Sequence, residues 1–271
     1  IVLGGDWRIP TSDSDEDASA AQNSLEWQIA LFFDPIYRGR WPESVEQTVG
    51  DRLAQATADA WSWTDDELAI VRDAHSHVYF MNTYTSLFAQ AIHPFNNPLD
   101  KFIIDFVGCG WRCDVGAQLS GYDANGKPIG TRSSNGWLFR HGRGMRDMVL
   151  WLHRRYPNMT FVVTENGWGD AENSAQEGQL DYERCNYFRD YVGNLSLAVL
   201  DGVHVAGYFA WSLLDNFEWA DGFDTRFGII YVDYQSQQRT PKLSAHWMRD
   251  HLTSRTGLLA SGQSLPPCKA P

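Results

Sequence analysis

The segment Phe161-Val162-Val163-Thr164-Glu165-Asn166-Gly167-Trp168 joins a run of apolar residues directly to a carboxylate and an Asn-Gly pair. This pattern predicts a short buried strand that ends where a turn begins. A parallel strand that is covered on both faces contains such a continuous apolar run, and in α/β enzymes the chemistry gathers at the carboxyl ends of these strands. Glu165 stands at that end, so it is either a functional carboxylate or an exposed carboxylate of a turn.

Three other apolar runs predict strands, and they begin at about residues 1, 78 and 205. Each of the four strands is followed by a segment with apolar residues at helical spacing. We therefore expect helices at Ala21–Ile36 with Asp34-Pro35 as its end, Asp65–Asp73, Met145–Tyr156, Asp181–Asp201 and Ser244–Leu252. The intervening segments Tyr37–Asp66 and Ser86–His141 are rich in glycine and proline and are predicted to be loops.

Alternating strands and helices with right-handed crossovers predict a parallel sheet. Four such units are half of the eight that close a (β/α)₈ barrel. We expect residues 1–255 to form one unit and the Gly-, Ser- and Pro-rich residues 256–271 to be a poorly ordered tail. Ile1-Val2-Leu3 resembles a strand that is cut at its start, which indicates a piece of a longer gene product.

The composition excludes several classes of protein. The 43% apolar content, with 12 Trp, 11 Tyr and 14 Phe, excludes a disordered chain. These aromatic rings suit stacking on sugar rings, although core packing explains most of them. The net charge of −12 argues against nucleic acid and anionic membranes as partners, and no apolar run is long enough to span a membrane. The eight histidines lack ligand spacing, so we predict no metal and no cofactor.

Four cysteines are too few for a disulfide scaffold. Cys109 and Cys113 are spaced to close a small loop or to remain two free thiols, and zinc would need a second pair. The triplets Asn158-Met159-Thr160 and Asn194-Leu195-Ser196 permit N-glycosylation in a secretory compartment, but such triplets also arise by chance. The compartment therefore stays open.

Three stretches together resemble family 1 glycoside hydrolases, the β-glucosidase and β-galactosidase family, in their carboxyl-terminal half. They are Thr164–Gly167, Gly207–Trp219 with the sequence GYFAWSLLDNFEW, and Arg226–Tyr234 with the sequence RFGIIYVDY. The resemblance extends to Asn82–Thr85, Gly126–Gly130 and Asp181–Arg184, and so spans nearly the whole chain before the tail.

The resemblance implies a (β/α)₈ barrel of which this chain contains only strands five to eight, beginning at about residues 1, 78, 161 and 205. It implies that Glu165 is the nucleophile and that Tyr84 holds its orientation. It further implies a sugar pocket made by Asn82 beside the reacting sugar, Trp211 under the ring, Glu218 and Trp219 on the hydroxyls, and Phe227 in the wall.

Three departures limit the resemblance. The family's acid/base Glu lies in an Asn-Glu-Pro motif that this chain does not contain, strands one to four are absent, and Phe80 stands where a Gly is usual. The acid/base must then come from a missing amino-terminal half or a complementing chain, and this chain alone is expected to be inactive. A subfamily that cleaves 6-phosphorylated sugars has Ser, Lys and Tyr where this chain has Glu218, Thr225 and Phe227, which favours an unphosphorylated sugar.

Two hypotheses follow. In the first, the chain is part of a retaining β-glycosidase that hydrolyses unphosphorylated β-glucosides or β-galactosides. In the second, it is a catalytically inactive half barrel that binds glycan or scaffolds an assembly.

Overall fold

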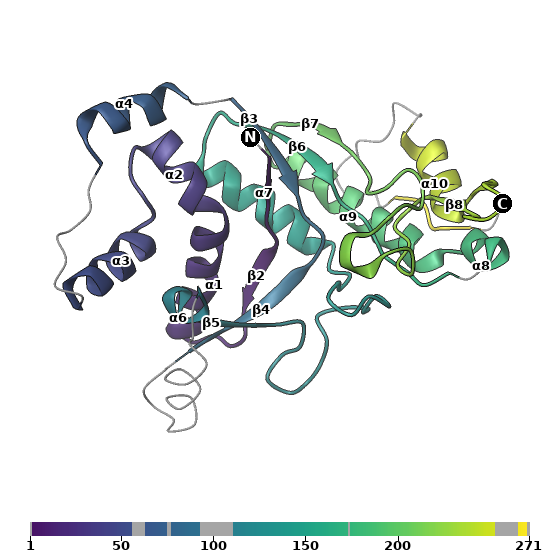
Figure 1. The fold of residues 1–271 in the computed structure, drawn as a ribbon, viewed down its shortest axis with the longest axis horizontal. Coiled ribbons are helices and arrows are strands. Elements are labelled where there is room, and N and C mark those ends of the chain that lie inside the picture. Colours follow the sequence, from purple (N-terminus) through teal and green to yellow (C-terminus); the bar gives the residue numbers. More distant parts are fainter. Residues whose placement is uncertain are drawn as a thin grey trace. The chain divides into compact units, whose positions relative to one another are not determined.

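The computed structural model describes residues 2–55, 63–74, 77–92, 111–172, 174–252 and 265–269 (Figure 1). By their internal contacts the residues fall into two compact units, a division that the sequence did not predict. Unit 1 comprises Ile1–Asp6, Val78–Ser86 and Pro128–Pro271, and unit 2 comprises Trp7–His77 and Leu87–Lys127.

Unit 1 contains a four-stranded parallel sheet, as the apolar runs predicted. Its order is β1 (Val2–Gly4), β3 (Val78–Asn82), β6 (Thr160–Glu165) and β7 (Val205–Tyr208). Each strand pairs with its neighbour in the sequence of strands, as expected for successive strand-helix units. β7 is shorter than the predicted strand, although the Trp211 amide still donates to the Asn166 carbonyl at 2.9 Å.

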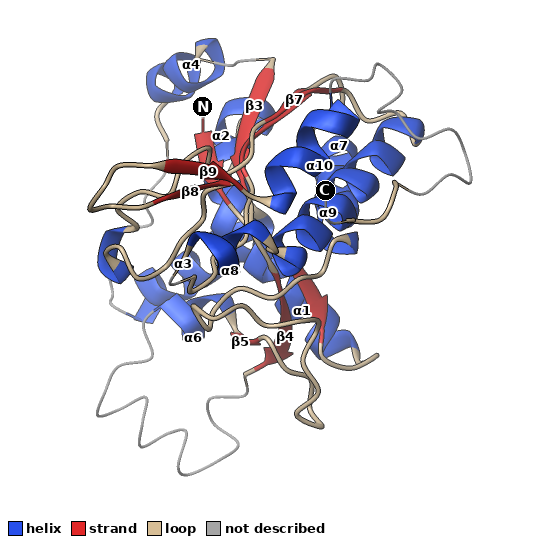
Figure 2. Cartoon of the chain, turned by 90° about the vertical axis from the view of Figure 1, so that its right-hand side faces the viewer, coloured by secondary structure: helices blue, strands red, loops and turns tan. Residues whose placement is uncertain are grey.

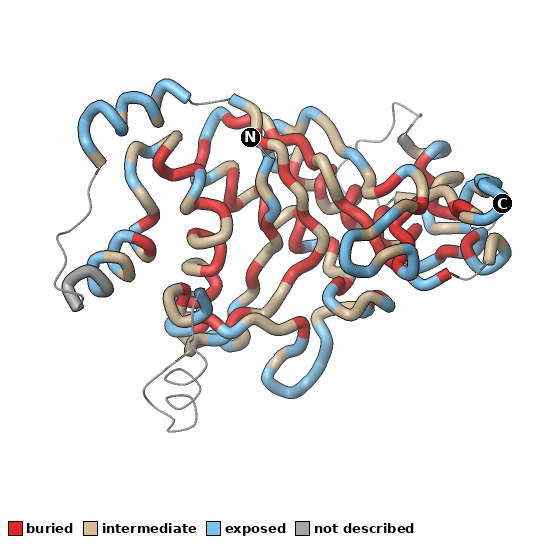
Figure 3. Tube along the Cα trace, in the orientation of Figure 1, coloured by how far each residue is buried: buried red, intermediate tan, exposed pale blue. Residues whose placement is uncertain are grey.

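The middle of this sheet is the core of unit 1 (Figure 3). Phe161, Val162 and Val163 are buried in succession, which is the burial of a strand covered on both faces. β3 buries Tyr79 and Met81 alternately with less buried neighbours. The register between β3 and β6 shifts after Met81, so that Asn82 pairs with Glu165. This shift brings the last residues of the two strands side by side.

Three long helices of unit 1 confirm the helical patterns. Helix α9 packs against α7 and against α10 (Figure 2). α9 stops before Gly202, whose φ of 95° is a left-handed conformation suited to glycine. The bounds are α7 Arg143–Arg155, α9 Tyr182–Leu200 and α10 Leu243–Leu252, with the short helices α8 Ala175–Gln179 and η2 Trp219–Asp221 and the antiparallel pair β8 Ile230–Val232 and β9 Arg239–Pro241.

Unit 2 corrects the sequence prediction in several places. The predicted loop at 37–66 contains helix α3, in which Gly50 is interior, because a helical glycine costs only about 1 kcal/mol. Pro42 starts that helix, since its carbonyl accepts from the Val45 amide at 3.0 Å. Asp34-Pro35 does not end the first helix, which continues to Gly39, where φ is 69°. The helices are α1 Asp15–Leu25, η1 Glu26–Ala30, α2 Leu31–Arg38, α3 Glu43–Gln55, α4 Asp65–Asp73 (as predicted) and α6 Trp111–Val115.

The prediction of a long loop at 86–141 is also wrong in part, because this segment contributes two strands to a second sheet. The order of this sheet is β2 (Trp7–Pro10), β4 (Ser86–Ala91) and β5 (Ala117–Ser120), with β4 and β5 antiparallel. Residues 93–110 of the predicted loop lie outside the described residues.

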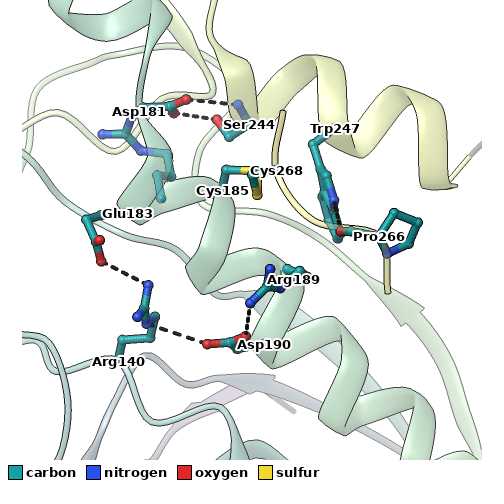
Figure 4. The surroundings of a disulfide bond; sticks show 11 residues. Arg140, Asp181, Glu183, Cys185, Arg189, Asp190, Ser244, Trp247, Pro266 and Cys268 are labelled. Carbon is teal, nitrogen blue, oxygen red and sulfur yellow. Dashed lines mark hydrogen bonds and ion pairs between the residues drawn. A yellow bond between two sulfur atoms is a disulfide. The ribbon is translucent and has the colours of Figure 1, made fainter. Parts of the chain in front are cut away.

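A disulfide anchors the described end of the chain. Cys268 is bonded to Cys185 in α9, and the Trp247 indole donates to the Pro266 carbonyl at 3.1 Å (Figure 4). Residues 265–269 are therefore held in place, in contrast to the predicted poorly ordered tail, while residues 256–264 and 270–271 lie outside the described residues. Cys113 is also disulfide-bonded, and Cys109 lies outside the described residues. Among the helices described, none has both the length and the apolar character needed to cross a membrane.

Candidate active site

The candidate site lies in unit 1, at the carboxyl ends of its parallel strands. Glu165 is the last residue of β6, and Asn82 is the last residue of β3. The Asn82 side-chain oxygen accepts a hydrogen bond from the Thr164 hydroxyl at 2.6 Å. The carboxyl ends of parallel strands share one edge of the sheet, which explains how residues 83 positions apart become neighbours.

Tyr84 is the direct partner of Glu165. Its hydroxyl donates to the Glu165 Oε2 at 2.7 Å. Burial, and next the hydrogen bond to Glu165, raise the pKa of the Tyr84 hydroxyl, so it stays protonated and can donate. The Tyr84 ring meets the edges or faces of Trp137 and Phe227, with ring centroids 5.8 and 6.0 Å away. Tyr84 therefore holds the carboxylate in one orientation and is itself packed between aromatic rings.

The backbone of Tyr84 is fixed from two directions. Its carbonyl accepts hydrogen bonds from the Tyr187 hydroxyl at 2.6 Å and the Tyr191 hydroxyl at 3.0 Å. Its amide donates to the Asp6 carboxylate at 2.9 Å. Tyr187 and Tyr191 are buried one helical turn apart in α9, and their rings stack with centroids 4.0 Å apart. Helix α9 thus positions the residue that orients Glu165.

Asn166 extends this network under the nucleophile candidate. It is fully buried, and its amide nitrogen donates to the Thr83 carbonyl at 2.6 Å and to the Tyr187 hydroxyl at 2.7 Å. Its side-chain oxygen accepts from the Tyr208 hydroxyl at 2.7 Å. A buried amide with all these partners stabilises one conformation of the turn. The sequence marked Asn166 only as a turn residue and missed this role.

Gly167 is needed at the next position for a steric reason. A Cβ atom there would lie 1.7 Å from the Trp211 carbonyl oxygen, which is backbone and cannot move aside. The chain after β6 therefore passes directly against the chain after β7. This close approach joins the Glu165 turn to the loop that carries the remaining candidates.

That loop carries Trp211, Glu218, Trp219 and Phe227. The Trp211 indole donates to the Glu218 Oε2 at 3.2 Å. Burial raises the pKa of Glu218, the Trp211 hydrogen bond lowers it, and the charges of Asp221 and Glu165 raise it further. Phe227 is buried beside Tyr84, whereas Trp219 is 77% exposed. The structure thus joins Tyr84, Glu165 and Phe227 by contact, pairs Trp211 with Glu218, and leaves Trp219 largely in solvent.

A buried ionic network forms the base of this loop. Asp215 accepts from the Arg226 guanidinium at 2.9 Å and from the Lys242 ammonium at 3.0 Å. Lys242 also contacts Glu172, which Arg184 binds at 2.5 Å. With Asp181 on Arg184, three carboxylates balance three cations, as buried charges require. No spacing in the sequence reveals this network, because its members come from four separate segments.

The Glu165 carboxylate is oriented by Tyr84, and its charge acts on the second, partly buried carboxyl group of Glu218. Such a pair suits chemistry at a sugar carbon, with one group attacking and polar neighbours fixing the hydroxyls. Within the described part of the chain, no three His, Cys, Asp or Glu side chains are grouped so that they could hold a metal ion.

Comparison with known proteins identifies the class to which this chain belongs. The model of glycosyl hydrolase family 1 matches residues 1–256, so the chain belongs to this family of glycosidases, as the motifs predicted. Among its relatives, Beta-glucosidase 26 of Oryza sativa subsp. japonica is 38% identical over 256 residues, a match that covers 94% of this chain and 47% of the relative. Beta-glucosidase 1B of Phanerodontia chrysosporium is 38% identical over 260 residues, covering 93% and 44%.

Solved structures give the same result. A rice Os3BGlu6 β-glucosidase mutant in a covalent complex with Glc matches with a TM-score of 0.80 and 34% identity, covering 92% of this chain and 50% of that one. A family 1 β-glucosidase from the fungus Humicola insolens in complex with glucose matches with a TM-score of 0.77 and 36% identity, covering 92% and 49%. The chain spans about half the length of the proteins that it matches.

Proposed function

We propose that this chain is the carboxyl-terminal half of a retaining β-glycosidase and that Glu165 is its nucleophile. The observation that carries the proposal is the Tyr84–Glu165 hydrogen bond of 2.7 Å at the carboxyl end of β6. A nucleophilic carboxylate must be ionised and correctly aimed, and a protonated tyrosine hydroxyl that donates to it serves both needs. The relatives are named β-glucosidases, which favours β-glucosides over β-galactosides as substrates.

The proposed reaction has two steps. Glu165 attacks the anomeric carbon while a general acid protonates the departing glycosidic oxygen, and a glycosyl ester forms on Glu165. Water then attacks the same carbon with the acid acting as base, so the configuration is retained. In this scheme Glu218 and Trp219 bind sugar hydroxyls, Trp211 lies under the ring, and Asn82 and Phe227 complete the pocket.

The acid/base residue is proposed to come from an amino-terminal half outside this chain. The chain contains no Asn-Glu-Pro motif, and it covers 47% of a relative's length. The two edges of the parallel sheet, β1 and β7, support a partner there, because edge strands present unpaired backbone groups. Val2 is 53% exposed and Phe209 is 61% exposed beside these edges. Additional strands would pair with both edges and cover these side chains.

The pocket favours an unphosphorylated sugar. Glu218, with its pKa raised mainly by burial, and Thr225 occupy positions at which a phosphate would need a cation. Arg226, a buried cation of this loop, donates to Asp215 and to the Val232 carbonyl. A phosphate at this position would therefore lie against a carboxyl group and not against a cationic hydrogen-bond donor.

The test is hydrolysis of an aryl β-glucoside by the full-length polypeptide that contains this chain, with the first sugar anomer identified by NMR. We expect the β-anomer to appear first, and we expect the chain of residues 1–271 alone to be slower by about 10² to 10⁴, because it lacks the general acid. Release of the α-anomer would refute the nucleophile role.

The second candidate function is a half barrel that binds glycan or scaffolds an assembly without turnover, which the lack of Asn-Glu-Pro in this chain favours. It predicts that the full-length polypeptide binds β-glucosides without hydrolysing them. Equilibrium binding of a non-hydrolysable thioglucoside, measured beside the rate assay, distinguishes the two functions.

A further inference from the structure

The two glycosylation triplets of this chain lie in different structural settings. Asn158-Met159-Thr160 joins helix α7 to strand β6, while Asn194-Leu195-Ser196 lies in the middle of helix α9. An N-linked oligosaccharide is bulky and polar, so its asparagine must face solvent in the folded protein. The structure allows the two triplets to be compared on this requirement.

Asn158 meets it. The residue is exposed, and its φ of 73° places it in the left-handed region that asparagine tolerates at turns. Met159 beside it is only 4% exposed and anchors the turn in the core. Thr160, which carries the hydroxyl of the triplet, is half-buried and lines an open concave surface with Val203 and His204. The asparagine and the threonine of this triplet are therefore accessible on either side of a buried anchor.

Asn194 does not meet the requirement for solvent access. Its side-chain amide donates to the Asp190 carbonyl at 2.8 Å, one turn earlier in α9. Ser196 is 6% exposed, and its hydroxyl donates to the Val192 carbonyl at 2.8 Å. A Cβ atom on the adjacent Gly193 would lie 3.7 Å from the Leu265 side chain, so another segment already covers the helix here. A glycan at Asn194 would disturb both the helix and this packing.

The cysteines indicate a compartment in which glycans are added. Cys185 is bonded to Cys268, and Cys113 is also disulfide-bonded. Disulfides persist in secreted proteins and in the lumen of the endoplasmic reticulum, and are rare in the cytosol. N-glycosylation of Asn-X-Ser/Thr takes place in the same secretory pathway.

We propose that Asn158 carries an N-linked oligosaccharide and that Asn194 does not. In the transfer step, the Asn158 amide nitrogen forms a bond to C1 of a lipid diphosphate-linked oligosaccharide. The bond from C1 to the phosphate oxygen breaks, the amide loses one proton to a base of the host's transferase, and the lipid diphosphate leaves. No electrons are exchanged with an oxidant or a reductant.

A glycan at Asn158 would not cover the candidate active site. Asn158 precedes the first residue of β6, and Glu165 is its last. The five steps from Thr160 to Glu165 correspond to about 17 Å of extended chain. A glycan at Asn158 therefore lies at the opposite end of the strand from Glu165, and the inference stands or falls independently of the proposed enzyme.

The test is translation of the full-length polypeptide, with its native amino terminus, in the presence of microsomes. We expect a protease-protected product whose gel mobility increases on treatment with an amidase that removes N-glycans. Asn158→Gln and Thr160→Ala should abolish this shift. Thr160→Ser preserves the triplet and Asn194→Gln is the matched control, so both should retain it.

Peptide mass spectrometry after deglycosylation in ¹⁸O water locates the modified residue, and it works equally for variants that fold poorly. Labelled aspartate at position 158 alone supports the proposal. Three results would overturn it: an unoccupied Asn158 in lumenal protein, occupancy of Asn194, or a polypeptide that is not translocated.

Discussion

The two sides of the candidate site differ in how firmly they are held. The nucleophile side comprises Tyr84, Glu165 and Asn166. Tyr84 donates a hydrogen bond to Glu165, and Asn166 donates one to Tyr187, whose ring stacks on another tyrosine of α9. On the loop side, comprising Trp211, Glu218 and Trp219, Glu218 receives one indole hydrogen bond and Trp219 is 77% exposed. The chain thus fixes the proposed nucleophile by itself and leaves the proposed sugar-binding residues on a more open loop.

This difference suggests a division of roles. A firmly held nucleophile lowers the cost of orienting the reacting group, and a more exposed loop is free to adapt to a ligand. Changes on the nucleophile side should therefore lower the rate of the chemical step, whereas changes on the loop side should weaken binding. The variants are made in the full-length polypeptide.

The largest effect is expected for Glu165→Gln. Removing a nucleophile should lower kcat for an aryl β-glucoside by at least about 10³-fold, because the glycosyl ester can no longer form. Glu183→Gln is the matched control. Glu183 is a half-exposed residue of α9 that forms an ion pair with Arg140, so this substitution should leave kcat unchanged. Unaltered circular dichroism in both variants would exclude unfolding. A kcat of Glu165→Gln near that of the wild type would contradict the account.

Tyr84→Phe should have the next largest effect. The variant keeps the ring between Trp137 and Phe227 but loses the hydrogen bond to a charged carboxylate, which is worth about 1.5 to 3 kcal/mol. We expect kcat to fall by about 10- to 100-fold with little change in KM. Tyr182→Phe, on the exposed start of α9, is the control.

The pH profile tests the same bond in the wild type. Because burial and Glu165 raise the pKa of Tyr84, the hydroxyl keeps its proton as the pH rises through the ordinary tyrosine range. No loss of kcat near pH 10 should therefore come from ionisation of Tyr84. An alkaline limb that is present in the wild type and missing in Tyr84→Phe would disagree with this expectation.

Tyr187→Phe removes the hydrogen bond that its hydroxyl donates to the Tyr84 carbonyl and the one that it accepts from Asn166. We expect kcat to fall by about fivefold, because about 1 kcal/mol of the roughly 2 kcal/mol of these two bonds reaches Glu165 through Tyr84. Tyr191→Phe should have a smaller effect, since Tyr187 still binds the same carbonyl. Both act through Tyr84, so in the Tyr84→Phe background each should add less than it does alone. Additive losses would place their effect outside this network.

Glu218 should give the smallest effect, and it should appear in binding rather than in kcat. Burial raises the pKa of Glu218, so it takes up a proton at a higher pH than an ordinary glutamate as the pH falls. The affinity for an inert β-thioglucoside should then weaken by about threefold on acidification, because a charged acceptor is replaced by a weaker neutral group. Calorimetry should show this pH dependence in the wild type and its absence in Glu218→Gln.

The sequence predicted the parallel sheet because buried parallel strands have a distinctive signal. Phe161-Val162-Val163 is an apolar run of this kind, and α7, α9 and α10 have clear helical stripes. The sequence did not predict helix α3, because this segment contains Gly50 and few apolar residues. Its helix propensity is therefore weak without its tertiary contacts. The short strand β5 has too few residues for a reliable alternation.

For the site, the motifs placed Glu165 and Tyr84 together, and the structure gives the bond between them. The supporting tyrosines were missed because Tyr187 and Tyr191 are 103 and 107 residues from Tyr84. In the sequence they are indistinguishable from core aromatics of α9. The Cys185–Cys268 disulfide, with a separation of 83 residues, was missed for the same reason.

The central claim is that Glu165 attacks the sugar. A 2-deoxy-2-fluoro-β-glucoside with an activated leaving group slows breakdown of the glycosyl ester and needs no general acid, so the intermediate accumulates. Incubation with the full-length polypeptide, followed by peptide mass spectrometry, should give a single fluoroglucosyl adduct on Glu165 that is missing in Glu165→Gln. Hydrolysis of β-glucosides without any adduct, or an adduct on a different carboxylate, would contradict the account.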